Sequence, residues 1–167
     1  MSPPKPSRTP CFYAGEHYVV GESMGHLLFQ LMISMRREIE ARMAEHDLTD
    51  AQWKPLWMLK MGHAGTALEL AREMGVDAGA ITRMLDRLEA KGLVQRVRSE
   101  TDRRVVNVQL TPEAEAVVEH IPHVLASVNN DYLRGFTKQE WQQFKELCQR
   151  MLANGQALQQ TRQEDAA

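Results

Sequence analysis

The 167-residue chain lacks the sequence features that mark the commonest enzymes and metal proteins. It has no glycine-rich phosphate loop, no nucleophile elbow and no HExxH motif. Its two cysteines, Cys11 and Cys148, stand far apart, and neither they nor the six histidines show metal-ligand spacing. We therefore expect no catalytic residues, no metal and no cofactor, and the prediction is that the protein is not an enzyme.

Long apolar runs are missing as well. No stretch approaches the roughly 20 apolar residues that span a bilayer, and the N-terminus lacks the charged-then-apolar order of a secretory signal. Two cysteines without a disulfide pattern suit a reducing compartment. These absences predict a cytoplasmic protein with no membrane partner.

A basic surplus, which nucleic-acid-binding domains usually carry, is absent from the chain as a whole. Its formal net charge is −2. The charges are unevenly distributed, because residues 78–104 hold seven basic and four acidic side chains. That segment is net positive while the remainder is net negative, so a local contact with nucleic acid stays possible.

The terminal segments differ in composition from the middle of the chain. Residues 1–10 contain four prolines, and residues 159–167 are polar. Such segments bury too little apolar surface to hold one conformation. We expect an N-terminal arm over residues 1–21 and a C-terminal tail over residues 159–167, both prone to fraying.

Helical periodicity predicts two helices in the first part of the body. Between residues 23 and 45 apolar side chains recur at helical spacing. Thr49 and Gln52 then form a capping box that opens a helix to about Met61, and a kink or a looser turn is expected at Pro55. The apolar positions of the first helix are Leu27, Leu28, Leu31, Met35, Ile39 and Met43.

Two shorter helices follow, separated by a tight turn. Thr66 and Glu69 form a second capping box, and Gly75 ends the helix that it opens. Asp77 can cap the next helix, over residues 78–91, and Gly92 can end it. Two short helices joined by three residues have the size and punctuation of a helix-turn-helix.

The period then changes from 3.6 to about 2. Residues 93–98 and 105–110 read as two strands joined by turn residues, which predicts a β-hairpin, or wing, beside the helix-turn-helix. Thr111 and Pro112 open a further helix, with a kink expected at Pro122, and a last capping box at residues 137–140 starts the final one. The expected fold class is mainly α with a small β-hairpin.

Three strings in this order resemble the MarR (multiple-antibiotic-resistance regulator) family: residues 48–53, residues 78–88 and the Asp-x-Arg at residues 102–104. The most specific run extends from Thr82 to Val94. The resemblance covers about residues 22–155. It implies a transcriptional regulator, typically a repressor, with a domain over residues 22–158: a winged helix-turn-helix lobe at 48–110 and dimerisation helices at 22–47 and 111–158. It further implies a homodimer that binds a pseudo-palindromic double-stranded operator and often releases it when a small aromatic molecule binds.

Candidate DNA contacts lie on the second helix of the helix-turn-helix motif, because a recognition helix presents its N-terminal residues to base edges. Small residues there would let the backbone approach the DNA, and Arg83 could bind guanine bidentately. Arg87, one turn later, could contact a phosphate or pair with a nearby acid. The candidates on this helix are Ala78, Gly79, Ala80, Thr82, Arg83 and Arg87.

The wing supplies the other candidates, Asp102, Arg103, Arg104 and Arg98. The resemblance implies that Arg104 enters the minor groove while Asp102 steadies the loop. A narrow, negative minor groove attracts arginine without a base code. Arg96 and Arg98 share one strand face, which points either towards phosphates or towards neighbouring acids.

An effector site is expected where the first two helices meet the lobe. Apolar and aromatic side chains there, together with one arginine, could hold a small aromatic carboxylate. The candidates are Met32, Arg36, Trp57, Met61 and His63.

Two other functions remain open at this stage. One is a redox-sensing regulator acting through Cys11 or Cys148, and the other is a dimeric adaptor of the same fold that does not bind DNA. The segment 12–20 is unusually aromatic for an arm, and packing across a dimer would explain it.

Overall fold

The computed structural model describes residues 10–102 and 104–165. It is mainly helical, with one two-stranded antiparallel sheet, and this confirms the expected fold class. Two short 3-10 turns, η1 (Gly15–His17) and η2 (Val20–Glu22), precede the helix α1 (Met24–Ala44). The remaining elements are α2 (Asp50–Lys60), α3 (Ala67–Met74), α4 (Ala78–Ala90), β1 (Val94–Arg98), β2 (Val106–Leu110), α5 (Pro112–Val118), α6 (Ile121–Tyr132) and α7 (Lys138–Glu164).

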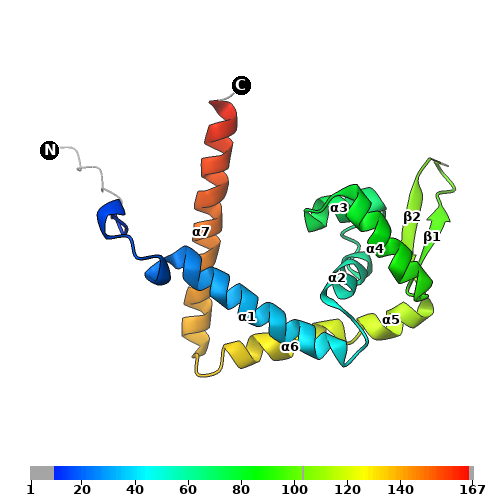
Figure 1. Ribbon diagram of the computed structural model, residues 1–167, viewed down its shortest axis with the longest axis horizontal. Helices are drawn as coiled ribbons and strands as arrows, with labels where there is room; N and C mark the ends of the chain where they lie inside the picture. Colours follow the sequence, from blue (N-terminus) through cyan, green and yellow to red (C-terminus); the bar gives the residue numbers. More distant parts are fainter. Residues whose placement is uncertain (1–9, 103, 166–167) are drawn as a thin grey trace.

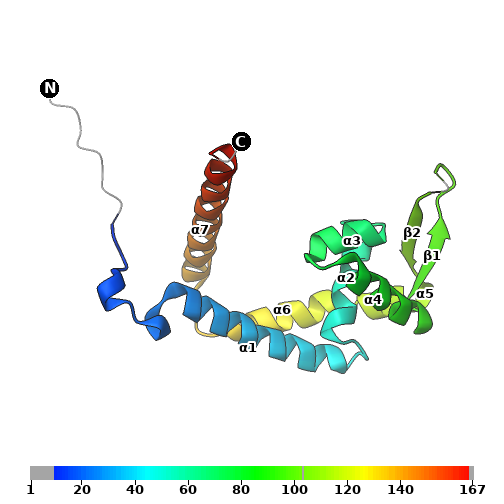
Figure 2. The ribbon, with the colours of Figure 1, turned by 45° about the horizontal axis from the view of Figure 1, so that its top comes forward.

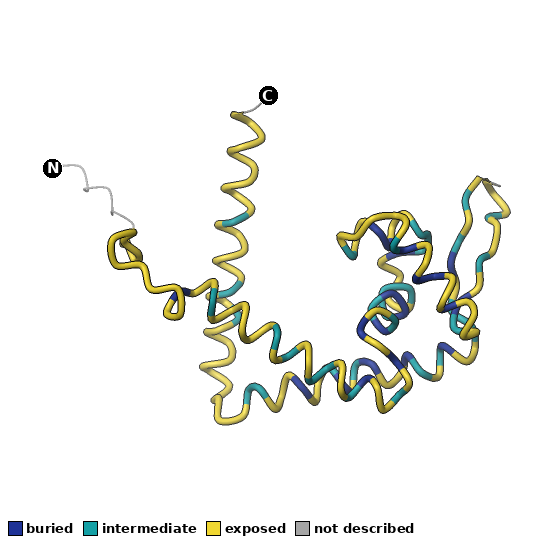
Figure 3. Tube along the Cα trace, in the orientation of Figure 1, coloured by how far each residue is buried: buried dark blue, intermediate teal, exposed yellow. Residues whose placement is uncertain are grey.

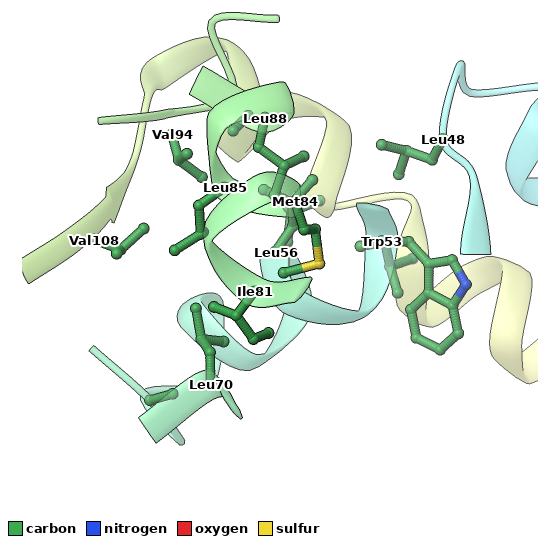
Figure 4. Close-up of a cluster of buried hydrophobic side chains, with 14 of the residues drawn as sticks. Leu48, Trp53, Leu56, Leu70, Ile81, Met84, Leu85, Leu88, Val94 and Val108 are labelled. Carbon is green, nitrogen blue, oxygen red and sulfur yellow. The ribbon is translucent and has the colours of Figure 1, made fainter. Parts of the chain in front are cut away.

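A compact lobe forms around the apolar face of α4. Ile81, Leu85 and Leu88 are almost fully buried, and they face Leu56 of α2 and Leu70 of α3 (Figure 4). Spacings of three and four residues place these side chains on one side of a helix, which leaves the opposite side free for solvent. The core of the lobe therefore fixes which face of α4 points outward.

The predicted helix boundaries of the helix-turn-helix are confirmed. Thr66 accepts a hydrogen bond from the backbone N–H of Glu69, and the Glu69 carboxylate accepts one from that of Thr66. Gly75 ends α3 with a φ of 64°, in the left-handed region that glycine adopts without strain. The Asp77 carboxylate then accepts from the N–H of Ala80 at 2.8 Å and starts α4.

The hairpin is anchored to the lobe by its buried face. β1 and β2 pair antiparallel, with Val94 opposite Leu110 and Arg98 opposite Val106. Val94 and Val108 are buried against the core, and the N–H of Val108 donates to the carbonyl of Gly65 at 2.8 Å. The base of the wing is thus rigidly attached beside α3 and α4, while its tip extends into solvent.

The prolines act differently from one another. α2 remains one continuous helix through Pro55, whose ring is buried. The helix expected to kink at Pro122 is instead interrupted between Val118 and Ile121, giving α5 and α6. Pro122 has no N–H to bond to the carbonyl of Val118, so the preceding turn is the weakest place in the helix.

Helices α1 and α6 run together along the base of the molecule (Figure 1). The Arg42 guanidinium of α1 binds Ser127 and Asp131 of α6, each at 2.7 Å. The hydroxyl groups of Ser34 and Tyr132 lie 2.6 Å apart. Polar links on the outer edges therefore reinforce this helix pair.

α7 stands away from the rest of the molecule, as the turned view shows (Figure 2). None of its residues is buried, and the same holds for residues 10–22 of the arm (Figure 3). The helix runs to Glu164, past the position where the tail was expected to begin at residue 159. Gln and Arg in this stretch are good helix formers, so polarity alone does not end it. Among the described residues, no helix is long and apolar enough to cross a membrane.

Candidate nucleic-acid interface

The N-terminal end of α4 forms a smooth, exposed patch. Ala78 and Gly79 are exposed, and Ala80 is partly buried. A Cβ at Gly79 would lie 3.1 Å from the Asp77 carboxylate and 3.4 Å from the Arg83 guanidinium. Glycine at this position therefore leaves room for Arg83 to extend towards the start of the helix.

The outward face of α4 carries Thr82, Arg83 and Arg87, all exposed. The Thr82 hydroxyl donates to the carbonyl of Ala78 at 2.8 Å, which leaves its oxygen able to accept another bond. The Arg87 Nε donates to the carbonyl of Arg83 at 3.2 Å. Within the described residues, neither Arg83 nor Arg87 forms an ion pair, so both guanidinium groups are available to a nucleic acid.

Two of the three acids considered as partners for Arg87, Asp86 and Glu89 but not Glu100, are instead paired with Arg96 of β1. Its two terminal nitrogens lie 2.7 Å from Asp86 and 2.6 Å from Glu89. The hydrogen bond with Asp86 is the main reason why the pKa of Arg96 is raised. Of the two directions open to Arg96, the structure shows the one towards neighbouring acids, whereas Arg98 is exposed at the end of the strand.

The wing tip is ordered by local hydrogen bonds. The Asp102 carboxylate accepts from the backbone N–H of Arg104 at 2.9 Å, and the N–H of Val105 donates to the Asp102 carbonyl. Arg104 itself is exposed. Arg103, also a candidate, lies outside the described residues. Asp102 thus holds the backbone that presents Arg104.

Arg72 was not anticipated from the sequence. A surface hollow of about 500 Å³ between α3 and the hairpin is bordered by both Arg72 and Arg104. In a helix-turn-helix the first helix crosses the phosphate backbone, and this was the available signal for a basic residue there. At the same hollow the pKa of Glu69 lies below its usual value, because its carboxylate accepts a hydrogen bond from the backbone N–H of Gly65 and is also hydrogen-bonded by Thr66.

A second, largely apolar cavity of about 420 Å³ lies between α1 and α2. Met32 and Arg36 border it, as does Asp50, a carboxylate that is only 7% exposed. Asp50 is held by Arg36 and Lys54, each at 2.9 Å, and by the indole N–H of Trp53 at 3.2 Å.

Only part of the expected effector set lies at this cavity. Trp57 is half-buried against the lobe core, and Met61 and His63 are exposed outside the cavity lining. Asp50 and Lys54 were missed, although their spacing of three and four residues along one helix places them on the same face as Trp53.

The cysteines lie apart, Cys11 exposed in the arm and Cys148 partly buried on α7. Among the described residues, no group of three or more His, Cys, Asp or Glu side chains could hold a metal ion.

Comparison with known proteins places this geometry in a family. Residues 48–106 match the model of the MarR family. The multiple antibiotic resistance protein MarR of Salmonella typhimurium is 35% identical over 96 residues, which is 58% of this chain and 67% of that protein.

Solved structures agree. The reduced form of MarR from E. coli superposes with a TM-score of 0.70 at 30% identity, covering 78% of this chain and 96% of that one. A mutant MarR from E. coli complexed with operator DNA gives 0.68 at 30% identity, covering 77% and 92%. BpsR of Bordetella bronchiseptica, in a structure concerning regulation of its DNA binding by 6-hydroxynicotinic acid, gives 0.68 at 25% identity, covering 80% and 96%.

Proposed function

Because the chain belongs to the MarR family, which consists of DNA-binding transcriptional regulators and not enzymes, we propose a specific mode of action for it. It binds a pseudo-palindromic operator as a homodimer, represses transcription there, and is released by a small aromatic acid. The observation that carries the DNA-binding part is the outward face of α4, where two arginines without an ion pair among the described residues lie beside a small-residue N-terminus.

In this proposal two elements of the lobe contact DNA in different ways: α4 is the base reader and the wing tip is the minor-groove reader. α4 enters the major groove, where the small side chains of Ala78, Gly79 and Ala80 permit close approach and Arg83 binds a guanine edge. Thr82 and Arg87 contact the flanking backbone. Arg104 and Arg103 at the wing tip enter the minor groove, with Asp102 as the support for the loop, and Arg98 lies near the phosphates.

Substitution of one arginine from each reader tests this division. We expect Arg83→Ala to reduce the preference for the operator over altered sequences, by about 1–3 kcal/mol at the base pair it reads. Arg104→Ala should weaken binding to all sequences and lower the slope of log affinity against log salt by about one. Relative affinities for operator variants that do not change in Arg83→Ala would remove that residue from base reading.

Dimerisation through residues 22–47 and 111–158, extended by α7 to residue 164, would explain the apolar surface outside the lobe. Trp141, Phe144, Leu147 and Met151 of α7 are 36% to 42% exposed, which is high for side chains that gain so much from burial. The arm also exposes apolar side chains, with Phe12 81% exposed. A symmetric partner would cover both, and a two-fold protein suits a two-fold operator.

The cavity between α1 and α2 is the proposed effector site. Its walls are mostly apolar, and its polar end holds two cations, Arg36 and Lys54, against the single carboxylate of Asp50. That end is therefore net positive and suits an apolar ligand with one negative charge. Met32 keeps its expected place in the wall, and of the two tryptophans of α2 it is Trp53, not Trp57, that borders the cavity. The regulation of BpsR by 6-hydroxynicotinic acid, which is a pyridine carboxylic acid, supports the ligand class.

Release requires that the effector binds the free form better than the operator-bound form. A 100-fold loss of operator affinity corresponds to about 2.7 kcal/mol of coupling, and operator must weaken effector binding by the same factor. Calorimetric titration with benzoates, hydroxycinnamates and pyridine carboxylates, with and without operator, measures both. Failure of every compound to bind below millimolar concentration, or unchanged binding in Arg36→Ala and Trp53→Ala, would overturn the site.

A further inference from the structure

Arg96 connects the two DNA readers of the lobe. It lies on β1, the strand that leads to the wing tip, yet the polar contacts of its side chain are all with α4. Besides the ion pairs with Asp86 and Glu89, its Nη2 lies 3.5 Å from the carbonyl of Thr82, and its backbone N–H donates to Glu89 at 3.3 Å. Arg96 of the hairpin thus contacts two turns of α4, and its side chain is only 29% exposed.

A phosphate contact is a poor explanation for this arginine. Its guanidinium donors are already directed at three acceptors, and the group formed with Asp86 and Glu89 carries a net charge of −1. Such a group repels a phosphate rather than attracting one. Two carboxylates next to a DNA-facing surface also weaken DNA binding in general. A structural role for the two carboxylates would explain their presence there.

That structural role is to fix the distance between Arg83 and Arg104. Arg83 near the start of α4 and Arg104 at the wing tip must reach adjacent grooves of one duplex at the same time. β2 is tied to the segment before α3, where the N–H of Val108 donates to the carbonyl of Gly65 and Asn107 forms a bridge with Thr66. On β1, Val94 is buried at the base, and among the described residues Arg96 supplies the polar contacts with α4 beyond it. A two-stranded hairpin is only marginally stable by itself, so the direction of β1 relative to α4 depends on such contacts.

We propose that Arg96 is a positioning residue that clamps β1 to α4, so that the base reader and the minor-groove reader engage the operator together. The inference rests on the proposed DNA-binding function. Loss of the clamp leaves both readers present but lets their spacing vary, which costs sequence preference more than overall affinity.

Neutralising the acids gives a test in which the two explanations predict different ratios of operator affinity to non-specific affinity. Asp86→Asn combined with Glu89→Gln keeps Arg96 and removes two negative charges. If Arg96 were a phosphate contact, releasing it would tighten binding to operator and non-specific duplex alike. The clamp predicts that the ratio of operator to non-specific affinity falls about tenfold, while non-specific affinity is unchanged or higher.

Glu100→Gln is the matched control. It removes one negative charge from the same hairpin but none of the Arg96 contacts, so operator and non-specific affinity should rise together and their ratio should stay the same. Arg96→Lys should behave like the double variant, because one ammonium group cannot hold both carboxylates in the planar geometry of a guanidinium.

The outcomes separate the two levels of the proposal. A wild-type protein without salt-dependent DNA binding would contradict the proposed function itself. A wild-type protein that prefers its operator, together with a double variant that keeps the same ratio, would overturn only the clamp. Should the double variant unfold in a thermal melt, Asp86→Asn alone keeps the Glu89 pair and is expected to lower the ratio by a smaller factor.

Discussion

The lobe differs from α7 and the N-terminal arm in how its apolar side chains are covered. In the lobe, large side chains such as Leu56, Leu85 and Leu88 are buried by the chain itself. In α7 and residues 10–22 of the arm no apolar residue is buried, and Leu152, Leu158 and Phe12 are each more than 60% exposed. The core of the lobe is covered within one chain, with buried residues of α1, α5 and α6 joining it, whereas α7 and the arm keep apolar side chains that a second copy could cover.

This difference separates two kinds of stability. Unfolding of the lobe should not depend on protein concentration, because its core lies within one chain. The arrangement of α7 should depend on concentration, since apolar burial there requires association. Substitutions in the two regions can therefore be told apart by what they change.

The largest effect is expected in the core of the lobe. Leu85 is fully buried between α4 and its neighbours, so Leu85→Ala should lower the free energy of unfolding by about 2–5 kcal/mol. Denaturant unfolding at several protein concentrations measures this. A loss below about 1 kcal/mol would mean that the lobe core is not packed as described.

A charge on the exposed face of α7 should instead dissociate the dimer. Phe144→Asp places a carboxylate in the proposed interface and is expected to raise the dimer dissociation constant about 100-fold. Sedimentation at micromolar concentration measures this, and Gln142→Asp on the same helix is the control. Equal dissociation constants for Phe144→Asp and the parent would show that this face lies outside any interface.

Two of the three capping boxes among the described residues allow a matched comparison of smaller size. Thr66 caps α3 in the lobe and Thr137 caps α7, with the same bonds to a glutamate three residues later. Thr66→Ala should cost about 1 kcal/mol of lobe unfolding. Thr137→Ala should leave that value unchanged and shift only the dimer dissociation constant. Equal effects of both on the unfolding of the lobe would contradict the separation of the two regions.

The smallest effect concerns the link between α1 and α6. The hydrogen bond from Arg42 is the main cause that holds the pKa of Asp131 below its usual value. Its contribution to stability is therefore present above the unfolded-state pKa, about 4, and is lost as the pH falls through the lower folded-state value. Asp131→Asn should be less stable than the parent at about pH 7 and nearly equal to it near about pH 2. A constant difference over this range would exclude the ion pair as its source.

Local signals in the sequence were sufficient for most of the fold. Capping residues such as Thr66 and Asp77 act within one turn, and the spacing of Ile81, Leu85 and Leu88 determines the buried face of α4, so both can be read without knowing the tertiary structure. The division between α5 and α6 was less predictable. Pro122 indicated an interruption, but whether the chain bends or breaks there depends on packing against α1.

The candidate sites were harder to predict because side-chain pairing is decided in three dimensions. Nothing in the sequence determines that Arg96, rather than Arg87, takes Asp86 and Glu89, since that choice depends on how β1 lies against α4. The same limit explains why only some of the residues predicted for the effector site lie at the cavity. Arg36 and Met32 border the cavity, but which face of α2 meets them, the one with Trp53 or the one with Trp57, follows from the crossing of two helices.

In the proposed function, two copies of this chain read one symmetric DNA site, each through α4 and the wing. The direct test is selection of bound duplexes from a random-sequence pool, followed by sedimentation of the best duplex with the protein. We expect an enriched sequence with two inverted half-sites about one helical turn apart, bound by two chains per duplex. The absence of any enriched sequence, or a single asymmetric site bound by one chain, would contradict it.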